Sequence, residues 1–397
     1  MGNKKPFIIL IALTAFIIAC EKTMPPAPEE SDLLDGPIEG LNAEQQAQFL
    51  KGDEAFGEVF TVESGLGPVF VANQCASCHA GDGKGTPFVG FTRFGQPDTL
   101  GNQFLTQGGP QLQHKAIPGY EPESLPTGVT STLLIAPAVS GLGYLDAVSD
   151  ADLIALSDPD DLDGDGISGR LHWNDIPDYV SLRPNSISNN GKYITRFGKK
   201  GGAYDLLHQT SGAYNQDMGV TSLFEPIDPY SGLEIDPEIS TQTVHDVVFY
   251  LKTLKSPIQR DANDPDVLAG KQLFIDIDCG GCHTPTLTTG SSSISLLANQ
   301  EFHPYTDLLL HDMGSDLDDN YTEGYALTSE WRTPALWGIG LSKDAQGGNY
   351  FLMHDGRATS LEEAILMHGG ESEGSKNSYE QLTNTEKEQL IKFLESL

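Results

Sequence analysis

Cysteine is scarce in this sequence, and the few residues present exclude a fold stabilised by disulfides. Only 5 cysteines occur in 397 residues. Four of them lie in two motifs of the form C-x-x-C-H, at residues 75–79 and 279–283, and the fifth is Cys20. Disulfide-rich domains carry far more cysteine than this. The two motifs account for both pairs, so no cysteine remains for a structural disulfide.

Positive charge and long apolar segments are also in short supply. The chain has 23 Lys and Arg against 56 Asp and Glu, a formal net charge of −33. Such acidity repels nucleic acid and anionic lipid surfaces, so we expect no nucleic-acid partner and a basic protein partner. The apolar run at residues 7–18 is too short for a comfortable membrane span.

The start of the chain predicts a lipoprotein signal peptide over residues 1–19. Lys4 and Lys5 precede the apolar run, and the small Ala19 before Cys20 resembles a bacterial lipobox. We therefore expect a lipid-anchored protein on the periplasmic side of the cell envelope, with an uncleaved N-terminal anchor as the alternative. Residues 20–40 are rich in proline and acidic residues and predict a flexible linker.

Each C-x-x-C-H motif is typical of covalent attachment of a c-type haem. Two thiols form thioether bonds to the porphyrin, and the adjacent His ligates the iron. A zinc site or a redox disulfide would explain a bare C-x-x-C, but neither needs the His that follows both pairs. We expect two covalently bound haem c groups, held by Cys75, Cys78, His79, Cys279, Cys282 and His283.

Helical patterns precede both motifs and predict a mainly α fold with two cytochrome c-like domains, each with one haem. Apolar spacing and capping residues indicate helices within 43–61, 148–156, 203–215, 240–254 and 266–274, and from 383 onward. The stretch from about 84 to 236 is rich in Gly, Pro, Asn and Asp, which predicts long loop-rich insertions. We place the N-terminal domain at 41–259 and the C-terminal domain at 260–397.

An acidic loop between the motifs predicts a structural calcium site. Asp161, Asp163 and Asp165 alternate before Gly166, which resembles the opening of an EF-hand loop. The closing Glu of such a loop is missing, because His172 stands at that position. An empty acidic loop is the alternative.

Several longer segments resemble the "di-haem oxidoreductase, putative peroxidase" family, some of whose members carry the label thiol oxidoreductase. They are residues 133–145 (LLIAPAVSGLGYL), 163–170 (DGDGISGR), 304–314 (PYTDLLLHDMG), 330–338 (EWRTPALWG) and 354–370 (HDGRATSLEEAILMHGG). The resemblance covers nearly all of residues 41–397. More distantly, the chain is similar to the bacterial di-haem cytochrome c peroxidases.

This resemblance implies a peroxidatic haem in the N-terminal domain and an electron-transfer haem in the C-terminal domain. His79 and His283 would be the proximal ligands, and the sixth ligand of the second haem would fall on His368. Met367 or Met353 is the alternative for that ligand. His311 and Met313 form a further cluster that we expect to shape the space between the haems rather than to bind iron.

The distal side of the first haem departs from the related peroxidases, which carry a distal His soon after the motif. No His occurs from residue 80 to 113, so His114 is the first candidate, with Gln113 and Asp146 as polar partners. Gln111 is a further polar neighbour, and Met218 is a possible sixth ligand. The resemblance implies reduction of peroxide or a similar oxidant. The alternatives are a non-catalytic electron-transfer cytochrome and an enzyme that oxidises thiols or a partner protein.

Other side chains have candidate roles around the haems. Arg332 and Arg357 suit haem propionates, because a guanidinium presents two parallel donors to a carboxylate; surface ion pairs are the alternative. Trp331, Trp337 and Tyr144 are candidates for positions between the haems, and aromatic core filling explains them equally well.

Overall fold

The computed structural model describes residues 28–81, 83–96 and 110–397. The predicted signal peptide and Cys20 therefore lie outside the described residues. Within these ranges, no helix combines the length and the apolar character that crossing a membrane requires.

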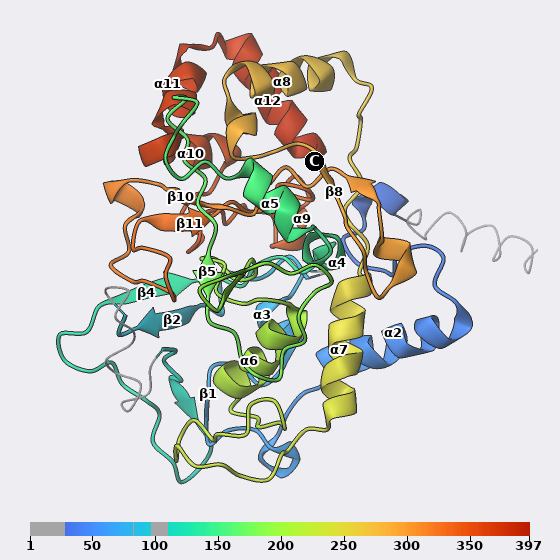
Figure 1. Cartoon of the computed structure of the whole chain (residues 1–397), viewed down its shortest axis with the longest axis vertical. Coiled ribbons are helices and arrows are strands. Elements are labelled where there is room, and N and C mark those ends of the chain that lie inside the picture. The colour runs from blue at the N-terminus through green and yellow to red at the C-terminus, as the bar shows by residue number, and fades with distance from the viewer. Residues whose placement is uncertain (1–27, 82, 97–109) are drawn as a thin grey trace, which may run out of the picture.

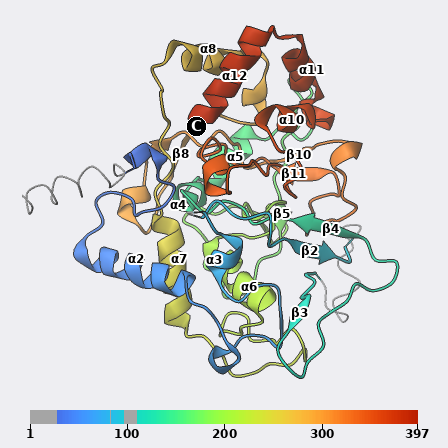
Figure 2. The same cartoon turned by 180° about the vertical axis from the view of Figure 1, so that it is seen from behind.

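The longer helices form two groups, one at one end of the molecule and one in the opposite half, with short helices, strands and loops between and around them. The two opposite views agree on this arrangement (Figures 1 and 2). The longer helices are α2 (Ala43–Phe56), α6 (Leu206–Met218), α7 (Thr241–Thr253), α8 (Pro265–Asp276), α11 (Glu373–Gln381) and α12 (Asn384–Ser396). The short ones are α3 (Cys75–Cys78), α4 (Leu142–Asp146), α5 (Asp150–Leu156), α9 (Ser342–Ala345) and α10 (Leu361–Leu366).

The strands are short, and most pair only in twos. They are β1 (Val69–Phe70), β2 (Phe91–Phe94), β3 (Lys115–Ala116), β4 (Ser131–Leu134), β5 (Trp173–Asn174), β6 (Ser188–Asn189), β7 (Lys192–Ile194), β8 (Leu287–Thr288), β9 (Glu301–Phe302), β10 (Leu310–Asp312) and β11 (Glu330–Arg332). The antiparallel pairs are β1–β3, β2–β4, β8–β9 and β10–β11, and β5–β7–β6 form one three-stranded sheet.

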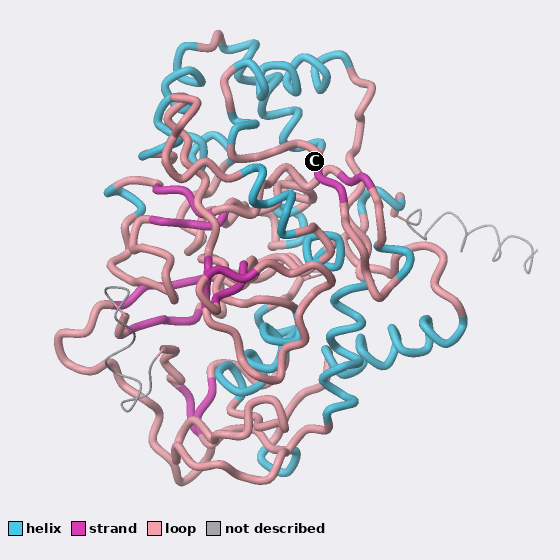
Figure 3. Tube along the Cα trace, viewed as in Figure 1, coloured by secondary structure: helices cyan, strands magenta, loops and turns pink. Residues whose placement is uncertain are grey.

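The predicted helices are confirmed, but a mainly α fold is too simple a description. Side-chain caps start α2 at Asn42, α7 at Ser240 and α12 at Thr383, as the sequence predicts. The long stretch between the motifs consists mostly of loops and short strands, and α4, α5 and α6 take up only a small part of it (Figure 3). Glycine, proline and asparagine there favour turns over helix, so the architecture is mixed and loop-rich.

The chain repeats one packing unit around each C-x-x-C-H motif. Before the first motif, α2 packs against α7, and a side chain at Gly52 would clash with the backbone of α7. Before the second motif, α8 packs against α12, and a side chain at Gly270 would clash with the backbone of α12. Glycine allows two helices to approach this closely because it has no Cβ. The two units are consistent with an internal duplication.

The predicted flexible linker is wrong for its last residues. Leu34 and Ile38 are 2% and 5% exposed, and the Ile38 N–H donates to the carbonyl of Thr253 at 2.8 Å. The Ser140 hydroxyl also donates to the carbonyl of Leu34 at 2.7 Å. Burial of two large aliphatic side chains favours this docking over a free tether. The segment therefore belongs to the folded body.

Candidate functional site

The second motif holds His283 in the form that an iron ligand needs. It follows a 3-10 turn, Cys279–Gly281, and the His283 N–H donates to the carbonyl of Cys279 at 3.0 Å. The ring Nδ1 lies 2.9 Å from the carbonyl oxygen of Tyr305. This bond assigns the ring proton to Nδ1 and leaves Nε2 free as a ligand. Burial lowers the pKa of His283 to about 4, so the imidazole is neutral.

His368 stands on the wall of the same cavity as His283. It comes just after α10, and its Nδ1 lies 2.7 Å from the carbonyl oxygen of Ala364. Its Nε2 is therefore also free. The two rings are close enough that a charge on His368 would lower the pKa of His283. The structure thus places two neutral imidazoles, each oriented by a backbone carbonyl, around one cavity.

That cavity is large and mostly apolar. Its empty space is about 2080 Å³, the open mouth included. Around the second motif its wall includes Cys279, Cys282, His283, His368, Phe274, Leu361, Ile365, Leu390 and Leu394. Two motif thiols, two free imidazole nitrogens and an apolar wall fit a porphyrin and its iron.

The first motif repeats the same local geometry. Cys75 and Cys78 lie on the single turn of α3, and the His79 N–H donates to the carbonyl of Cys75 at 3.0 Å. His79 Nδ1 lies 3.1 Å from the carbonyl oxygen of Pro137, and burial lowers its pKa to about 4. Pro137 itself lines the large cavity, which therefore extends from the second motif toward the first.

A polar cluster beside the first motif joins Gln111, a candidate from the sequence, to Asp217, which the sequence did not single out. Gln111 donates a short hydrogen bond to the carboxylate of Asp217. Burial raises the pKa of Asp217, and the charge of this carboxylate helps to raise the pKa of both Cys75 and Cys78. Among the described residues, Gln111 Oε1 and Arg93 Nε are buried without a hydrogen-bond partner. Asp217 is thus a buried carboxyl group near the first motif, and its position next to Met218 was its only signal in the sequence.

The other residues predicted for the distal side lie in different settings. His114 is exposed. Gln113 is buried, and its amide donates to the backbone carbonyl of Gln216 at 2.8 Å. Met218 is 2% exposed within the main hydrophobic core. The structure brings Gln111 and Gln113 together at the C-terminal end of α6, and His114, the next residue in the chain, is exposed.

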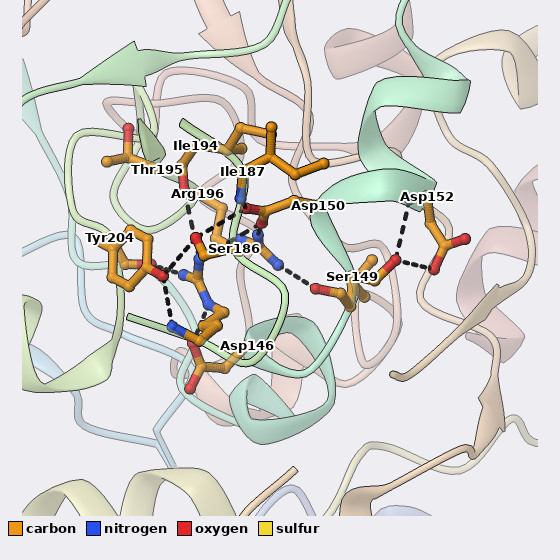
Figure 4. A network of polar contacts seen from close by, with 12 residues as sticks. Asp146, Ser149, Asp150, Asp152, Ser186, Ile187, Ile194, Thr195, Arg196 and Tyr204 are labelled. Atoms are coloured by element: carbon orange, nitrogen blue, oxygen red, sulfur yellow. Dashed lines mark hydrogen bonds and ion pairs between the residues drawn. The ribbon is translucent and has the colours of Figure 1, made fainter. Parts of the chain in front are cut away.

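Asp146 belongs to a buried network of charges (Figure 4). Its carboxylate lies 3.3 Å from Arg183 Nε and 2.9 Å from Lys252 Nζ. Burial would raise the pKa of Asp146, but these two cations outweigh it and hold the pKa below its usual range. In the same network, Arg196 lies 2.6 Å from Asp150, and both side chains are almost fully buried. This setting supports a structural role for Asp146.

An Asp146→Asn variant separates the structural role from the catalytic one. We expect the free energy of unfolding to fall by about 2 kcal/mol, because charge-assisted hydrogen bonds to two cations are weakened. We expect the rate of reaction with peroxide to stay unchanged. Urea denaturation and stopped-flow mixing measure the two effects. An unchanged stability with a large loss of rate would restore the catalytic prediction.

Of the two arginines predicted to bind propionates, the cavity includes one. Arg332 lines it, and its Nε and Nη1 donate to the carbonyls of Gly198 and Thr333 at 3.0 and 2.9 Å. Arg357 is not among the lining residues. It is exposed, and its Nε lies 2.8 Å from the carboxylate of Asp355.

Some of the aromatic candidates and alternative ligands line the cavity, and others do not. Trp331, Trp337, Met353 and Met313 line the cavity, whereas Met367 and Tyr144 do not. The Trp331 ring stacks on His354 with a centroid distance of 3.9 Å.

His311 is held between two carboxylates and is not free to bind iron. Its Nε2 lies 2.7 Å from Asp307, and its Nδ1 lies 2.8 Å from Glu371. Although burial alone would lower the pKa of His311, hydrogen bonds to these acids raise it well above its usual value. Its Nδ1 is also 3.5 Å from Cys282 Sγ. We call Asp307, His311 and Glu371 the histidine clamp.

The three carboxylates of the acidic loop converge. Oxygen atoms of Asp161, Asp163 and Asp165 all lie within 4.8 Å of one another on an exposed surface. Asp161 has a positive φ of 47°, which bends the loop at this point. His172 is 3% exposed, and its Nδ1 lies 2.9 Å from the carbonyl oxygen of Lys200, so it adds no ligand.

The two C-x-x-C-H motifs and the apolar cavity fit a haem-binding protein. The chain belongs to the family described as "Di-haem oxidoreductase, putative peroxidase", which matches residues 127–397. Membership implies haem cofactors. The matched region contains the second motif, and the first motif lies before it.

The chain was also compared with curated proteins and with solved structures. No curated protein matches the chain. Among solved structures, hydrazine synthase of Kuenenia stuttgartiensis pressurised with xenon is 14% identical. The match covers 94% of this chain and 96% of that one, with a TM-score of 0.39.

Proposed function

We propose that this chain is a di-haem c-type oxidoreductase of the peroxidase type. It would receive electrons at its C-terminal site and reduce peroxide or a similar small oxidant at its N-terminal site. The observation that carries the proposal is the pair of imidazoles, His283 and His368, on the wall of one apolar cavity with their Nε2 atoms free.

The residues of the C-terminal site would hold a haem without leaving a place for substrate. Cys279 and Cys282 would form the thioether bonds, and His283 and His368 would both be ligands of the iron. A haem bound in this way supplies one-electron transfer. The carbonyls of Tyr305 and Ala364 keep both rings in the ligating tautomer.

The residues of the N-terminal site differ in a way that suits catalysis. His79 has the same orientation as His283, and Cys75 and Cys78 would form the attachment. Reduction of peroxide to water consumes two electrons and two protons, so a group near the oxidant must transfer protons. Asp217 is a buried carboxyl group near this motif, its pKa is raised, and Gln111 orients it. We propose that Asp217 transfers these protons.

The first test is an electron paramagnetic resonance spectrum of the ferric protein, repeated after one-electron reduction and after mixing with peroxide. We expect a low-spin signal with two His ligands and a high-spin signal that disappears on reaction with peroxide. Two low-spin signals that stay inert in the half-reduced protein would instead identify an electron-transfer cytochrome.

We also propose that the acidic loop binds calcium. If it does, calcium at 100 times its dissociation constant would stabilise the fold by about 2.7 kcal/mol. Thermal denaturation with calcium and with a chelator measures this shift. The triple variant Asp161→Asn, Asp163→Asn, Asp165→Asn should lose it. Identical curves for the unmodified protein under both conditions would mean that the loop stays empty.

The location of the protein follows from the same proposal. C-type haems are attached outside the cytoplasm, which agrees with a signal peptide at 1–19 and a lipid on Cys20. The net charge of −33 favours a basic redox partner. A Cys20→Ser variant should move from the membrane fraction to the soluble periplasmic fraction, and retention in the membrane would contradict the lipid anchor.

A further inference from the structure

Two lysines line the large cavity without a carboxylate partner. Lys84 lies five residues after His79, and Lys199 lies in the turn between β7 and α6. Neither forms an ion pair with a described acidic residue, although the chain carries 56 Asp and Glu against 23 Lys and Arg. In so acidic a protein, two unpaired cations in one cavity indicate that an anion binds there.

The two ammonium groups are close enough to repel each other. Burial lowers the pKa of Lys84 to about 7, and the charge of Lys199 contributes. Burial also lowers the pKa of Lys199 to about 8, Arg332 on the same wall contributes, and the charge of Asp355, which forms no ion pair with Lys199, acts in the opposite direction. Burying like charges together is costly unless an opposite charge compensates them.

The neighbouring Lys200 shows how this fold treats a buried lysine that has a purely structural role. Its ammonium group donates to three backbone carbonyls at 2.9 to 3.1 Å. It also lies 3.4 Å from the carboxylate of Asp319. Lys199 has no comparable set of partners among the described residues, so its ammonium group is left available to a ligand.

The backbone around Lys84 is held in place from outside its own loop. The carbonyl of Gly83 accepts a hydrogen bond from the Val139 N–H at 3.0 Å, and the Gln346 amide donates to the carbonyl of Gly85 at 3.1 Å. Contacts on both sides of Lys84 keep this part of the cavity wall preformed. A preformed site loses less entropy when it binds its ligand.

We infer that Lys84 and Lys199 form a carboxylate-binding site, and that its ligands are the propionates of the N-terminal haem. The charge of Lys199 lowers the pKa of His79, which places the pair near the first motif. Pro137, whose carbonyl orients His79, lines the same cavity as both lysines. The inference rests on the proposed function, since it needs a haem at this motif.

The test compares midpoint potentials of both haems in the full-length, haem-loaded protein by spectroelectrochemical titration. The variants are Lys84→Gln, Lys199→Gln and the double substitution. Removing positive charge near a haem stabilises its ferric form, so we expect a lower midpoint potential for the N-terminal haem and a larger shift in the double variant. Lys199→Arg keeps the charge and should keep the potential. Lys343→Gln, an exposed lysine on α9, is the matched control and should change nothing.

A second measurement identifies the source of the carboxylate. Formate and acetate are titrated into the unmodified protein and into the double variant. A formate-dependent change of potential that only the unmodified protein shows would support the carboxylate site and assign it to a free anion instead of a propionate. No dependence on formate, together with the lowered potential, would support the propionate.

The inference and the proposed function fail in different ways. A pyridine haemochrome assay that finds no covalent haem would overturn the proposed function. Two covalent haems whose potentials are the same in the double variant and in the unmodified protein, without any effect of formate, would overturn the lysine site alone.

Discussion

Replacing His368 with Met should raise the midpoint potential of the C-terminal haem by a sizeable part of the roughly 0.8 V range that axial ligands span. Thioether sulfur stabilises ferric iron less well than imidazole does, so a His/Met haem is easier to reduce than a His/His haem. The position can accept the change, because His368 lies on an apolar wall and Met is flexible enough to reach the same point. Spectroelectrochemical titration measures the shift, and a near-infrared charge-transfer band reports the sulfur ligand.

Two control variants test the alternative ligands for the same iron. Met367 is not among the residues that line the cavity, so Met367→Leu should leave the spectra unchanged. Met353 does line it, and Met353→Leu should also be silent if His368 is the ligand. An unchanged potential in His368→Met, combined with a high-spin C-terminal haem in Met353→Leu, would transfer the ligand role to Met353.

The attachment motifs and the helices around them were predictable because each depends on residues near one another in the chain. A capping residue, an apolar stripe and a C-x-x-C-H spacing act within a few turns of backbone. The same holds for the acidic loop. Its three carboxylates stand at alternate positions of one tight turn, and such a turn brings them together. His368 was placed by its resemblance to a ligand position, and the structure brings it to the cavity of His283.

The contacts that the sequence did not reveal join residues far apart in the chain. Asp217 meets Gln111 across 106 positions, and no periodic pattern marks such a pair. In the sequence, Lys84 and Lys199 likewise look like ordinary surface lysines, and only the fold shows that both line the same cavity. Asp146 is the opposite case, because a carboxylate that looked available is held by Arg183 and Lys252. Burial and partner choice are tertiary properties, which local residue spacing does not report.

Breaking the histidine clamp should destabilise the protein more than any other single polar change considered so far. Asp307→Asn leaves the buried His311 with one of its two carboxylates, and removing one member of a buried ion pair costs about 3 to 5 kcal/mol. His311 and Asp307 are each 2% exposed, so water cannot replace the lost partner. Urea denaturation at neutral pH measures the effect. Asp312→Asn, at an exposed position on β10, is the control and should change stability by no more than about 0.5 kcal/mol.

The histidine clamp also predicts how the free energy of unfolding depends on pH. Glu371 controls the loss of stability at low pH, and His311 controls the loss at high pH. Burial would raise the pKa of Glu371, but hydrogen bonds from His311, Ser168 and the Asp312 N–H lower it from 4.5 to about 2. Its contribution is therefore complete above pH 4.5 and is lost as the pH falls toward 2. His311 has the opposite sign, because its pKa is raised in the folded protein. Its contribution is complete below its unfolded pKa of 6.5 and is lost as the pH rises through the folded value.

Two variants test which residue causes the loss of stability at each end of the pH range. Glu371→Gln should flatten the loss of stability between pH 4.5 and 2, and His311→Gln should flatten the alkaline loss, each relative to the unmodified protein. Denaturation curves across the pH range give both slopes. If Glu371→Gln loses as much stability between pH 4.5 and 2 as the unmodified protein does, another carboxylate causes that loss. The histidine clamp would then not keep its charges in the native state.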